Sequence, residues 1–335
     1  MDAFEKKTLK TSRGYTYTYY TSTGDKSLPA LLFLHGWPDH AAMWADVAGP
    51  LRSKYPIIVP DMLGYDGTDK PTDTSAYCWD GMANDLVEII EAEQHEKVVS
   101  IGHDWGSVAA SRLCQHYPDR VVGLINLNVP YTPLFREPFD LKTMNDTTEK
   151  HFGYRIFSYW EVFTADDGAE LVDKNLERLY HVMHGQGETM KDLFCTPGAL
   201  REYLVNGATT PIRLRPFAES PAFKSAFLSR FARDSMAAPF NWYKANTTNV
   251  QYESDRVLPD TADKLDIPVL YIGATEDLVC RPETLIPSIQ RGLLPRLEQA
   301  EMVKAQHWVT YENPGPVVER ISEWLGRQFG KQGIL

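Results

Sequence analysis

The hydrophobic pattern of the first 130 residues alternates between two periods. Residues 15–21 largely alternate Tyr and Thr, as a strand with one buried face does, and short apolar runs predict buried strands at 30–34, 56–60, 97–102 and 121–127. Apolar side chains recur at helical spacing over 81–93, and a second helix is predicted over 107–117, where Pro118 ends it. Strands that alternate with helices predict an α/β fold with a mostly parallel sheet flanked by helices.

The alternation stops near Pro130. Between residues 135 and 260 the chain has no clear apolar strand run, is rich in aromatic, Arg and Pro residues, and shows helical spacing at 170–183, 197–207 and 239–247. Strand-like runs return at 268–273 and 296–300, and an amphipathic helix is predicted over 316–329. We therefore expect an α/β core over residues 1–134, an inserted helical cap over 135–260, and the second part of the core over 261–335.

Composition excludes some partners. Lys and Arg number 34 and Asp and Glu 45, so the net charge is −11, which argues against a nucleic-acid or anionic-membrane partner. No run approaches the roughly 18 apolar residues of a membrane helix, and residues 1–10 lack the apolar segment of a secretory signal. The four cysteines show neither a C-x-x-C pair nor zinc-ligand spacing, so we expect reduced thiols and a cytoplasmic location. The pattern specifies no oligomeric state.

Residues 102–106, with the sequence GHDWG, predict a sharp strand-to-helix turn that presents Asp104 above the sheet. A carboxylate in this position is a competent nucleophile toward an sp3 carbon that bears a leaving group, and the product is an alkyl ester on the enzyme. The alternative is that Asp104 only caps the following helix. The flanking Gly102 and Gly106 favour the nucleophile, because a simple cap needs neither glycine.

Hydrolysis of such an ester requires an activated water. His307 follows the last predicted strand, which is where the order nucleophile, acid, histidine places the base. Asp277 follows the strand predicted at 268–273 and is expected to orient the imidazole of His307, with the adjacent Glu276 as the alternative. These three positions together predict a catalytic triad.

An oxyanion site is predicted where the strand at 30–34 ends. The next residues are His35, Gly36, Trp37 and Pro38. The backbone N–H groups of Trp37 and Trp105 can bind the oxyanion that forms when water attacks the ester, although a plain Gly-Pro turn would have the same sequence.

The leaving group separates two candidate reactions. A halide leaves without a proton, whereas an epoxide oxygen needs an acid, and Tyr phenols with a pKa of about 10 stay protonated at neutral pH. Tyr154 and Tyr243 lie in the predicted cap, but the chain has 17 tyrosines, so periodicity alone does not select these two.

Taken together, these residues resemble the α/β-hydrolase-fold epoxide hydrolases of the soluble and microbial type. The resemblance spans nearly the whole chain. It rests on His35-Gly36-Trp37-Pro38, on Gly102 to Ser107, on Asn241-Trp242-Tyr243, on the segment around Asp277 and on His307-Trp308. The first two motifs are shared with dehalogenases, and the Asn-Trp-Tyr motif is the more discriminating one. Tyr154 matches the first cap tyrosine of the family through its neighbours, with Tyr159 as the alternative.

The resemblance implies a two-step reaction. Tyr154 and Tyr243 would polarise the oxirane oxygen while Asp104 attacks a ring carbon, and water activated by His307 and Asp277 would then release a vicinal diol. It implies a small-molecule epoxide and water as the reactants, and neither a cofactor nor a metal.

Three other functions stay open at this point. A dehalogenase can use the same nucleophile. In secondary metabolism, some relatives of the resembled family use the epoxide to close an internal ring instead of hydrolysing it. A non-catalytic binding protein would predict a broken triad, and here all three candidates are present. Asp66 stands where family members often carry Gly or Ser, and residues 188–215 cannot be aligned with the family, so the substrate is not specified.

Overall fold

The computed structural model describes residues 1–208 and 210–330. Within these residues a sheet of eight strands has the order β1-β2-β4-β3-β5-β6-β7-β8, and the six strands from β4 to β8 run parallel. The strands are β1 Glu5–Lys10, β2 Thr16–Ser22, β3 Ala30–Leu34, β4 Ile57–Pro60, β5 Val98–His103, β6 Val121–Leu127, β7 Val269–Ile272 and β8 Leu297–Gln299. The predicted α/β fold with a mostly parallel sheet is confirmed, and every apolar run that predicted a strand overlaps one.

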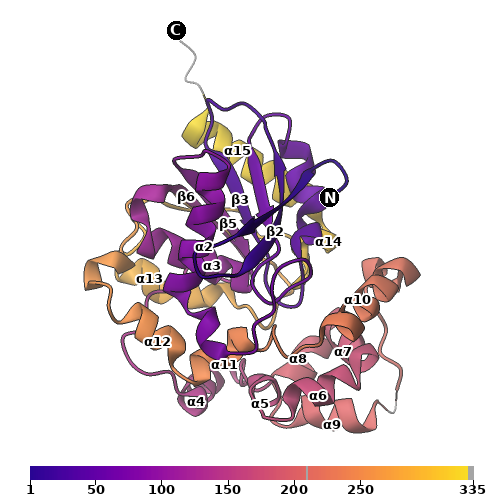
Figure 1. Cartoon of the computed structure of the whole chain (residues 1–335). Coiled ribbons are helices and arrows are strands. Elements are labelled where there is room, and N and C mark those ends of the chain that lie inside the picture. The colour runs from indigo at the N-terminus through magenta and orange to yellow at the C-terminus, as the bar shows by residue number, and fades with distance from the viewer. Residues whose placement is uncertain (209, 331–335) are drawn as a thin grey trace. The chain divides into compact units, whose positions relative to one another are not determined.

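Alternate residues of the central strands point to opposite faces of the sheet, as a pleated strand requires. On one face they form a continuous hydrophobic core with the helices α1 (Ala45–Ala48) and α15 (Pro314–Phe329). The strand residues of this core are Leu31, Phe33, Ile57, Val59, Val99, Ile101, Ile125, Leu127, Leu270 and Ile272. The helices α2 (Trp79–Ala92) and α3 (Trp105–His116) pack on each other, and α3 also packs on β5 and β6 (Figure 1). Both faces of the parallel strands are therefore covered, which explains why the strands read as uninterrupted apolar runs.

Helices and short turns link the strands. The helices around the sheet are α1 Ala45–Ala48, α2 Trp79–Ala92, α3 Trp105–His116, α13 Ile286–Gln290, α14 Val309–Glu312 and α15 Pro314–Phe329. Short 3-10 turns span Ala41–Trp44, Gly49–Leu51, Thr74–Tyr77, Pro118–Arg120, Pro216–Glu219, Asp260–Asp263 and Pro282–Leu285. Among the described residues, none of the helices is both long and apolar enough to cross a membrane.

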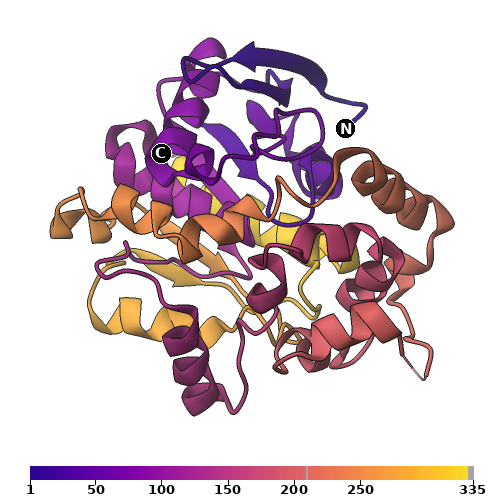
Figure 2. The same cartoon turned by 60° about the horizontal axis from the view of Figure 1, so that its bottom comes forward.

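The chain divides into two compact units. The first comprises residues 1–70, 78–136 and 254–335, and the second comprises residues 71–77 and 137–253. The second unit consists of helices and connecting loops (Figure 2). Its helices are α4 Leu141–Phe152, α5 Trp160–Phe163, α6 Gly168–Asp173, α7 Leu176–His184, α8 Thr189–Phe194, α9 Ala199–Asn206, α10 Pro221–Asp234 and α11 Asn241–Thr247, and α12 Val250–Asp255 leads back into the first unit.

The helical spacing over residues 170–183 corresponds to two helices, α6 and α7. The break lies at Asn175, whose backbone leaves the helical conformation with φ −131° and ψ 31°. Asn competes for backbone hydrogen bonds and therefore favours such a break, and its side chain here donates to the carbonyl of Leu171.

A buried ion pair joins the two segments of the first unit that flank the long insertion. Arg112 of α3 donates to both carboxylate oxygens of Asp255 at 2.9 and 2.7 Å, and both side chains are fully buried. The same guanidinium donates to the carbonyls of Thr132 and Pro133 at 2.7 and 3.1 Å. One side chain thus fixes the chain where it leaves the first unit and where it returns.

We expect the change Asp255→Ala to lower the free energy of unfolding by about 3–5 kcal/mol, because it leaves the Arg112 charge buried without its partner. Urea denaturation followed by circular dichroism measures this loss. Asp266→Ala is the control, because it breaks an exposed pair with Lys264 and should cost about 1 kcal/mol or less. Equal losses in the two variants would show that the buried pair does not hold these segments.

Candidate active site

Asp104 lies in the turn between β5 and α3, with a positive φ of 54° and a ψ of −127°. Two glycines make this turn possible. A Cβ atom on Gly102 would lie 2.1 Å from the carbonyl oxygen of Gly106, and one on Gly106 would lie 2.0 Å from the carbonyl oxygen of Leu34. A helix cap would accept from the N–H of the second or third residue of α3, and the side chain of Asp104 makes no such capping hydrogen bond, so the helix cap considered above has no support.

Backbone N–H groups hold the carboxylate of Asp104. The N–H of Trp37 donates to Oδ1 at 2.8 Å, and the N–H of Trp105 also bonds to this carboxylate. The loop that carries Trp37 comes so close that a Cβ on Gly36 would lie 2.3 Å from Oδ1. The peptide bond between Trp37 and Pro38 is cis. The two N–H groups predicted to form an oxyanion site therefore both contact Asp104.

His35 belongs to the same loop, and its ring nitrogens contact backbone groups. Its ring Nε2 accepts a hydrogen bond from the N–H of Met62 at 2.8 Å, and its Nδ1 lies 2.9 Å from the carbonyl of Gly36. The buried ring thus ties the loop after β3 to the loop after β4.

The imidazole of His307 lies between two carboxylates. Its Nδ1 donates to Asp277 Oδ2 at 2.9 Å, and its Nε2 faces Asp104 Oδ2 at 3.7 Å. The other oxygen of Asp277 accepts from the N–H groups of Val279 and Cys280 at 3.0 and 2.9 Å. Glu276, the alternative acid, is exposed, whereas Asp277 is buried. Asp104, His307 and Asp277 therefore form one row, although they come from three distant segments.

The charges of this row shift its ionisation. Burial lowers the pKa of His307, but the attraction and hydrogen bond of Asp277 and the charge of Asp104 outweigh burial and raise the pKa to about 9. Burial raises the pKa of Asp277, but the charge of His307 and the hydrogen bonds outweigh it, so that this pKa is lowered. Burial also raises the pKa of Asp104, against the opposing charge of His307. At neutral pH the row holds an imidazolium next to an ionised Asp277.

A second histidine packs against the base. The ring of His103 lies 4.8 Å from that of His307 between centroids, and its Nε2 donates to the His307 carbonyl at 2.8 Å. Burial lowers the pKa of His103 to about 3. His103 therefore stays neutral and supports the backbone of the His307 loop.

Sequence reasoning missed two residues that fix the row. Asn128, which follows β6 in a left-handed conformation, donates from its side-chain amide to Asp277 Oδ2 at 2.8 Å. Asp39 accepts from the indole of Trp308 at 3.0 Å and from the hydroxyl of Tyr311 at 2.8 Å. Both are polar residues that come shortly after an apolar strand run, and this position was the signal available in the sequence.

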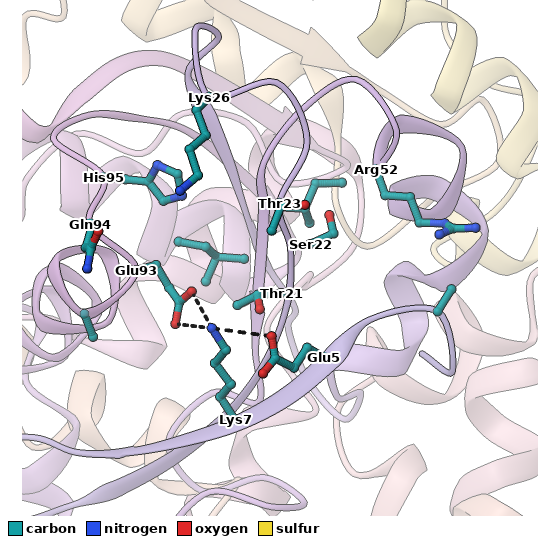
Figure 3. A pocket seen from close by; sticks show the side chains of 14 residues that line it. Glu5, Lys7, Thr21, Ser22, Thr23, Lys26, Arg52, Glu93, Gln94 and His95 are labelled. Carbon is teal, nitrogen blue, oxygen red and sulfur yellow. Dashed lines mark hydrogen bonds and ion pairs between the residues drawn. The ribbon is translucent and has the colours of Figure 1, made fainter.

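One cavity of the first unit lies near the amino ends of the parallel strands, opposite to their carboxyl ends. It has a volume of about 540 Å³ and is lined by residues near the ends of β2 and α2 and the start of β4. Figure 3 shows its lining, where Lys7 forms ion pairs with Glu93 and Glu5 at 2.9 and 3.7 Å. Since Asp104, Asp277 and His307 all follow the carboxyl ends of parallel strands, this cavity is separate from them.

In the second unit, Tyr243 of α11 lies buried in a cluster of aromatic rings. Its ring meets those of Tyr159, Trp160 and Phe163 edge to face, with centroids 5.9, 5.2 and 5.0 Å apart. Tyr159 also stacks on Phe194 at 4.6 Å, and it is only partly buried. Edge-to-face and stacked rings fix the orientation of both phenols.

Tyr154 has other neighbours. Its ring lies 5.3 Å from Nζ of Lys191 and 6.3 Å from the ring of Phe152. Of the two tyrosines considered for the first cap position, the structure therefore brings Tyr159, the alternative, into the cluster of Tyr243.

Two groups of described side chains offer metal-ligating atoms within 4.8 Å of one another. They are Asp104, Cys280 and His307 in the row itself, and His40, Asp61 and Asp66 in the loops after β3 and β4. The second group includes Asp66, the residue that departs from the pattern of the resembled family.

Comparison with known proteins identifies the fold and its relatives. A family model described as the α/β-hydrolase fold matches residues 29–314. Epoxide hydrolase 1 of Caenorhabditis elegans is 25% identical over 92% of this chain and 68% of its own length. Bifunctional epoxide hydrolase 2 of Sus scrofa is 25% identical over 89% of this chain, which spans only 51% of that relative.

A solved structure gives the same fold. The epoxide hydrolase from an endophytic Streptomyces superposes with a TM-score of 0.79 over 98% of this chain and 97% of its own, at 24% sequence identity. At this level of identity the likeness establishes the fold alone.

We expect the change Asp104→Asn to lower the pKa of His307 below its value of about 9, because the amide removes one of the charges that raise it. The imidazole should then lose its proton at a lower pH than in the unchanged protein. NMR titration of the ring nitrogens of His307 measures the shift. Lys7→Met, in the cavity near the amino ends of the parallel strands, should leave the titration unchanged. An unchanged His307 pKa in Asp104→Asn would contradict the electrostatic coupling of the two residues.

Proposed function

The chain belongs to the α/β-hydrolase fold family, and on this premise we propose that it hydrolyses an epoxide to a vicinal diol through an ester on Asp104. The observation that carries the proposal is the row of Asp104, His307 and Asp277, with the N–H of Trp37 on one oxygen of the nucleophile. The relatives named epoxide hydrolase, which align with about nine-tenths of the chain, support the same reaction.

The two oxygens of Asp104 take different parts in the first step. Oδ1 is held by the N–H of Trp37, so Oδ2 is the oxygen that attacks the ring carbon. A bond forms between Oδ2 and this carbon while the carbon–oxygen bond of the ring breaks, and the ring oxygen receives a proton from a tyrosine. The product is an alkyl ester whose carbonyl oxygen is Oδ1.

The second step uses the same N–H groups. His307 takes a proton from water, and the hydroxide attacks the carbonyl carbon of the ester, so that negative charge develops on Oδ1 beside the N–H of Trp37 and of Trp105. Collapse of this intermediate breaks the bond between the carbonyl carbon and the alkyl oxygen, which takes the proton held by His307 and leaves as the diol. The proton of the resulting carboxylic acid passes to the tyrosinate, so that both the carboxylate of Asp104 and the phenol are restored. Esterification removes the charge of Asp104, which is one cause of the raised His307 pKa, and so favours the neutral imidazole that acts as base.

The proton for the ring oxygen comes in this proposal from Tyr243 together with a second tyrosine. The ring contact between Tyr243 and Tyr159 supports Tyr159 as that partner, in place of Tyr154. Two phenols that belong to one aromatic cluster can donate to the same oxygen. Tyr159 shares the cluster of Tyr243, whereas the ring of Tyr154 contacts the ammonium group of Lys191.

A haloalkane would use Asp104 and His307 in the same way but would need no phenol. The paired tyrosines of the second unit therefore favour an epoxide, and closure of an internal ring on an epoxide remains the second candidate outcome of the same activation. The diol, the halide and the cyclic ether are distinguished by their masses.

We expect the variant His307→Gln to accumulate the ester, because the nucleophile remains while the base is lost. Mass spectrometry of the intact protein should show an addition equal to the whole mass of the epoxide, on the peptide that holds Asp104. A haloalkane would add its mass less that of the hydrogen halide.

The matched control is the double variant His307→Gln with Asp104→Ala, which should carry no adduct. An adduct that persists in the double variant, or none with any member of a panel of aryl, aliphatic and spiro epoxides, would refute the role of Asp104.

We expect Tyr159→Phe to reduce kcat/KM for an epoxide by about tenfold to a hundredfold, since general acid catalysis contributes roughly 10²–10⁴-fold and two phenols would share it. Tyr154→Phe is the comparison, and its loss should be the smaller of the two. Steady-state kinetics with diol detection measures both, and circular dichroism checks folding. A larger loss in Tyr154→Phe would return the assignment to Tyr154.

A further inference from the structure

A thiol lies beside the histidine of the site. Sγ of Cys280 is 3.6 Å from Nδ1 of His307, and the backbone N–H of Cys280 donates to Asp277 Oδ1 at 2.9 Å. The spacing of the cysteines along the sequence excludes a local zinc motif, but the fold brings Cys280 and His307 together from positions 27 residues apart. The mechanism proposed above gives this thiol no part.

Asp104 completes a set of three different donors. One donor atom each from Asp104, Cys280 and His307 lies within 4.8 Å of the other two. Thiolate sulfur, imidazole nitrogen and carboxylate oxygen are the three ligand types that proteins use for Zn²⁺, at about 2.3, 2.0 and 2.1 Å. A tetrahedral ion with these bond lengths has its ligands roughly 3.3–3.8 Å apart. The 3.7 Å between Nε2 of His307 and Oδ2 of Asp104 already lies in this range, whereas Sγ of Cys280, which is 3.6 Å from Nδ1, has to shift toward Nε2.

The surroundings of the set match those of a zinc-binding histidine. Asp277 accepts the proton of His307 Nδ1, which leaves Nε2 as the nitrogen that faces Asp104. A carboxylate on the far nitrogen of the ring is the usual partner of a zinc ligand, because it fixes the ring and increases its basicity. Asp277 is itself held by Asn128, so this partner is rigid before any ion arrives.

We propose that Asp104, Cys280 and His307 form an inhibitory site for Zn²⁺. On binding, the thiol of Cys280 and the imidazolium Nε2 of His307 each release a proton to solvent. The sulfur then enters as thiolate, Nε2 of the neutral imidazole and the carboxylate of Asp104 supply two further ligands, and water takes the fourth position. The ion then occupies both the nucleophile and the base. Binding of the ion follows from the donors alone, whereas the resulting inhibition rests on the function proposed above.

The other group of potential ligands provides an internal comparison. His40, Asp61 and Asp66 offer one nitrogen and two oxygens but no sulfur, and Asp61 already accepts backbone N–H groups at 2.8 and 3.3 Å. Thiolate favours Zn²⁺, whereas carboxylate oxygens favour Mg²⁺ and Ca²⁺. Mg²⁺ and Ca²⁺ should therefore not replace Zn²⁺ at the site that contains Cys280.

The test titrates the full chain with Zn²⁺ and follows diol formation, each variant being compared with its own activity in metal-free buffer. We expect half-inhibition of Cys280→Ser to need at least about tenfold to a hundredfold more Zn²⁺ than the unchanged protein, and His40→Asn to need the same amount as the unchanged protein. Cys280→Ala serves as a second variant if Cys280→Ser folds poorly. Loss of inhibition in His40→Asn, or equal inhibition in all proteins, would overturn the proposal.

Binding is read separately with Co²⁺, which occupies zinc sites and absorbs in the near ultraviolet when a thiolate coordinates it. We expect this sulfur-to-cobalt band in the unchanged protein and in His40→Asn but not in Cys280→Ser. Its absence from the unchanged protein would refute the site. A Cys280-dependent band in a protein that still forms diol at full rate would uphold the metal site and refute the catalytic roles of Asp104 and His307.

Discussion

The close passage of three backbone segments around Asp104 is the constraint on which the rest of the site depends. Gly102 and Gly106 allow β5 to turn into α3 within a few residues. A Cβ atom on either glycine would collide with backbone, on Gly102 with that of Gly106 and on Gly106 with that of Leu34. A non-glycine residue with the φ of Asp104 costs on the order of 1–3 kcal/mol, so its surroundings must hold it. The hydroxyl of Ser107, which bonds to the carbonyls of Gly102 and Leu127, contributes to this support.

The parallel sheet explains why distant residues meet at this turn. The segments that follow β3, β5, β6, β7 and β8 supply Trp37, Asp104, Asn128, Asp277 and His307 in that order. The carboxyl ends of parallel strands lie at one edge of a sheet, so each strand delivers the residue that follows it to the same place. The long insertion does not disturb this arrangement, because it leaves and re-enters near Arg112, which binds both ends of the gap.

The sequence predicted those parts of the molecule whose signal is local. Buried strands are short apolar runs, so β3 and β6 have the expected bounds, whereas β1, an exposed edge strand with the sequence EKKTLK, has no such run and was missed. The helices α4 and α10 were missed as well, since their apolar residues cover only a narrow face. Which tyrosine accompanies Tyr243 depends on ring packing between α5, α8 and α11, and motif spacing does not encode that packing.

The partners of Asp277 indicate what this residue contributes. Its four hydrogen bonds come from Asn128, His307 and the N–H groups of Val279 and Cys280, which nearly fill the lone-pair positions of a carboxylate. An anion held by four donors has little tendency to take up a proton, and its pKa is accordingly lowered. Asp277 therefore acts as a fixed negative charge that orients His307 and stabilises the imidazolium. The same fixed charge increases the basicity of the opposite nitrogen of the ring, which makes it a better acceptor of a proton from water and a better ligand for a metal ion.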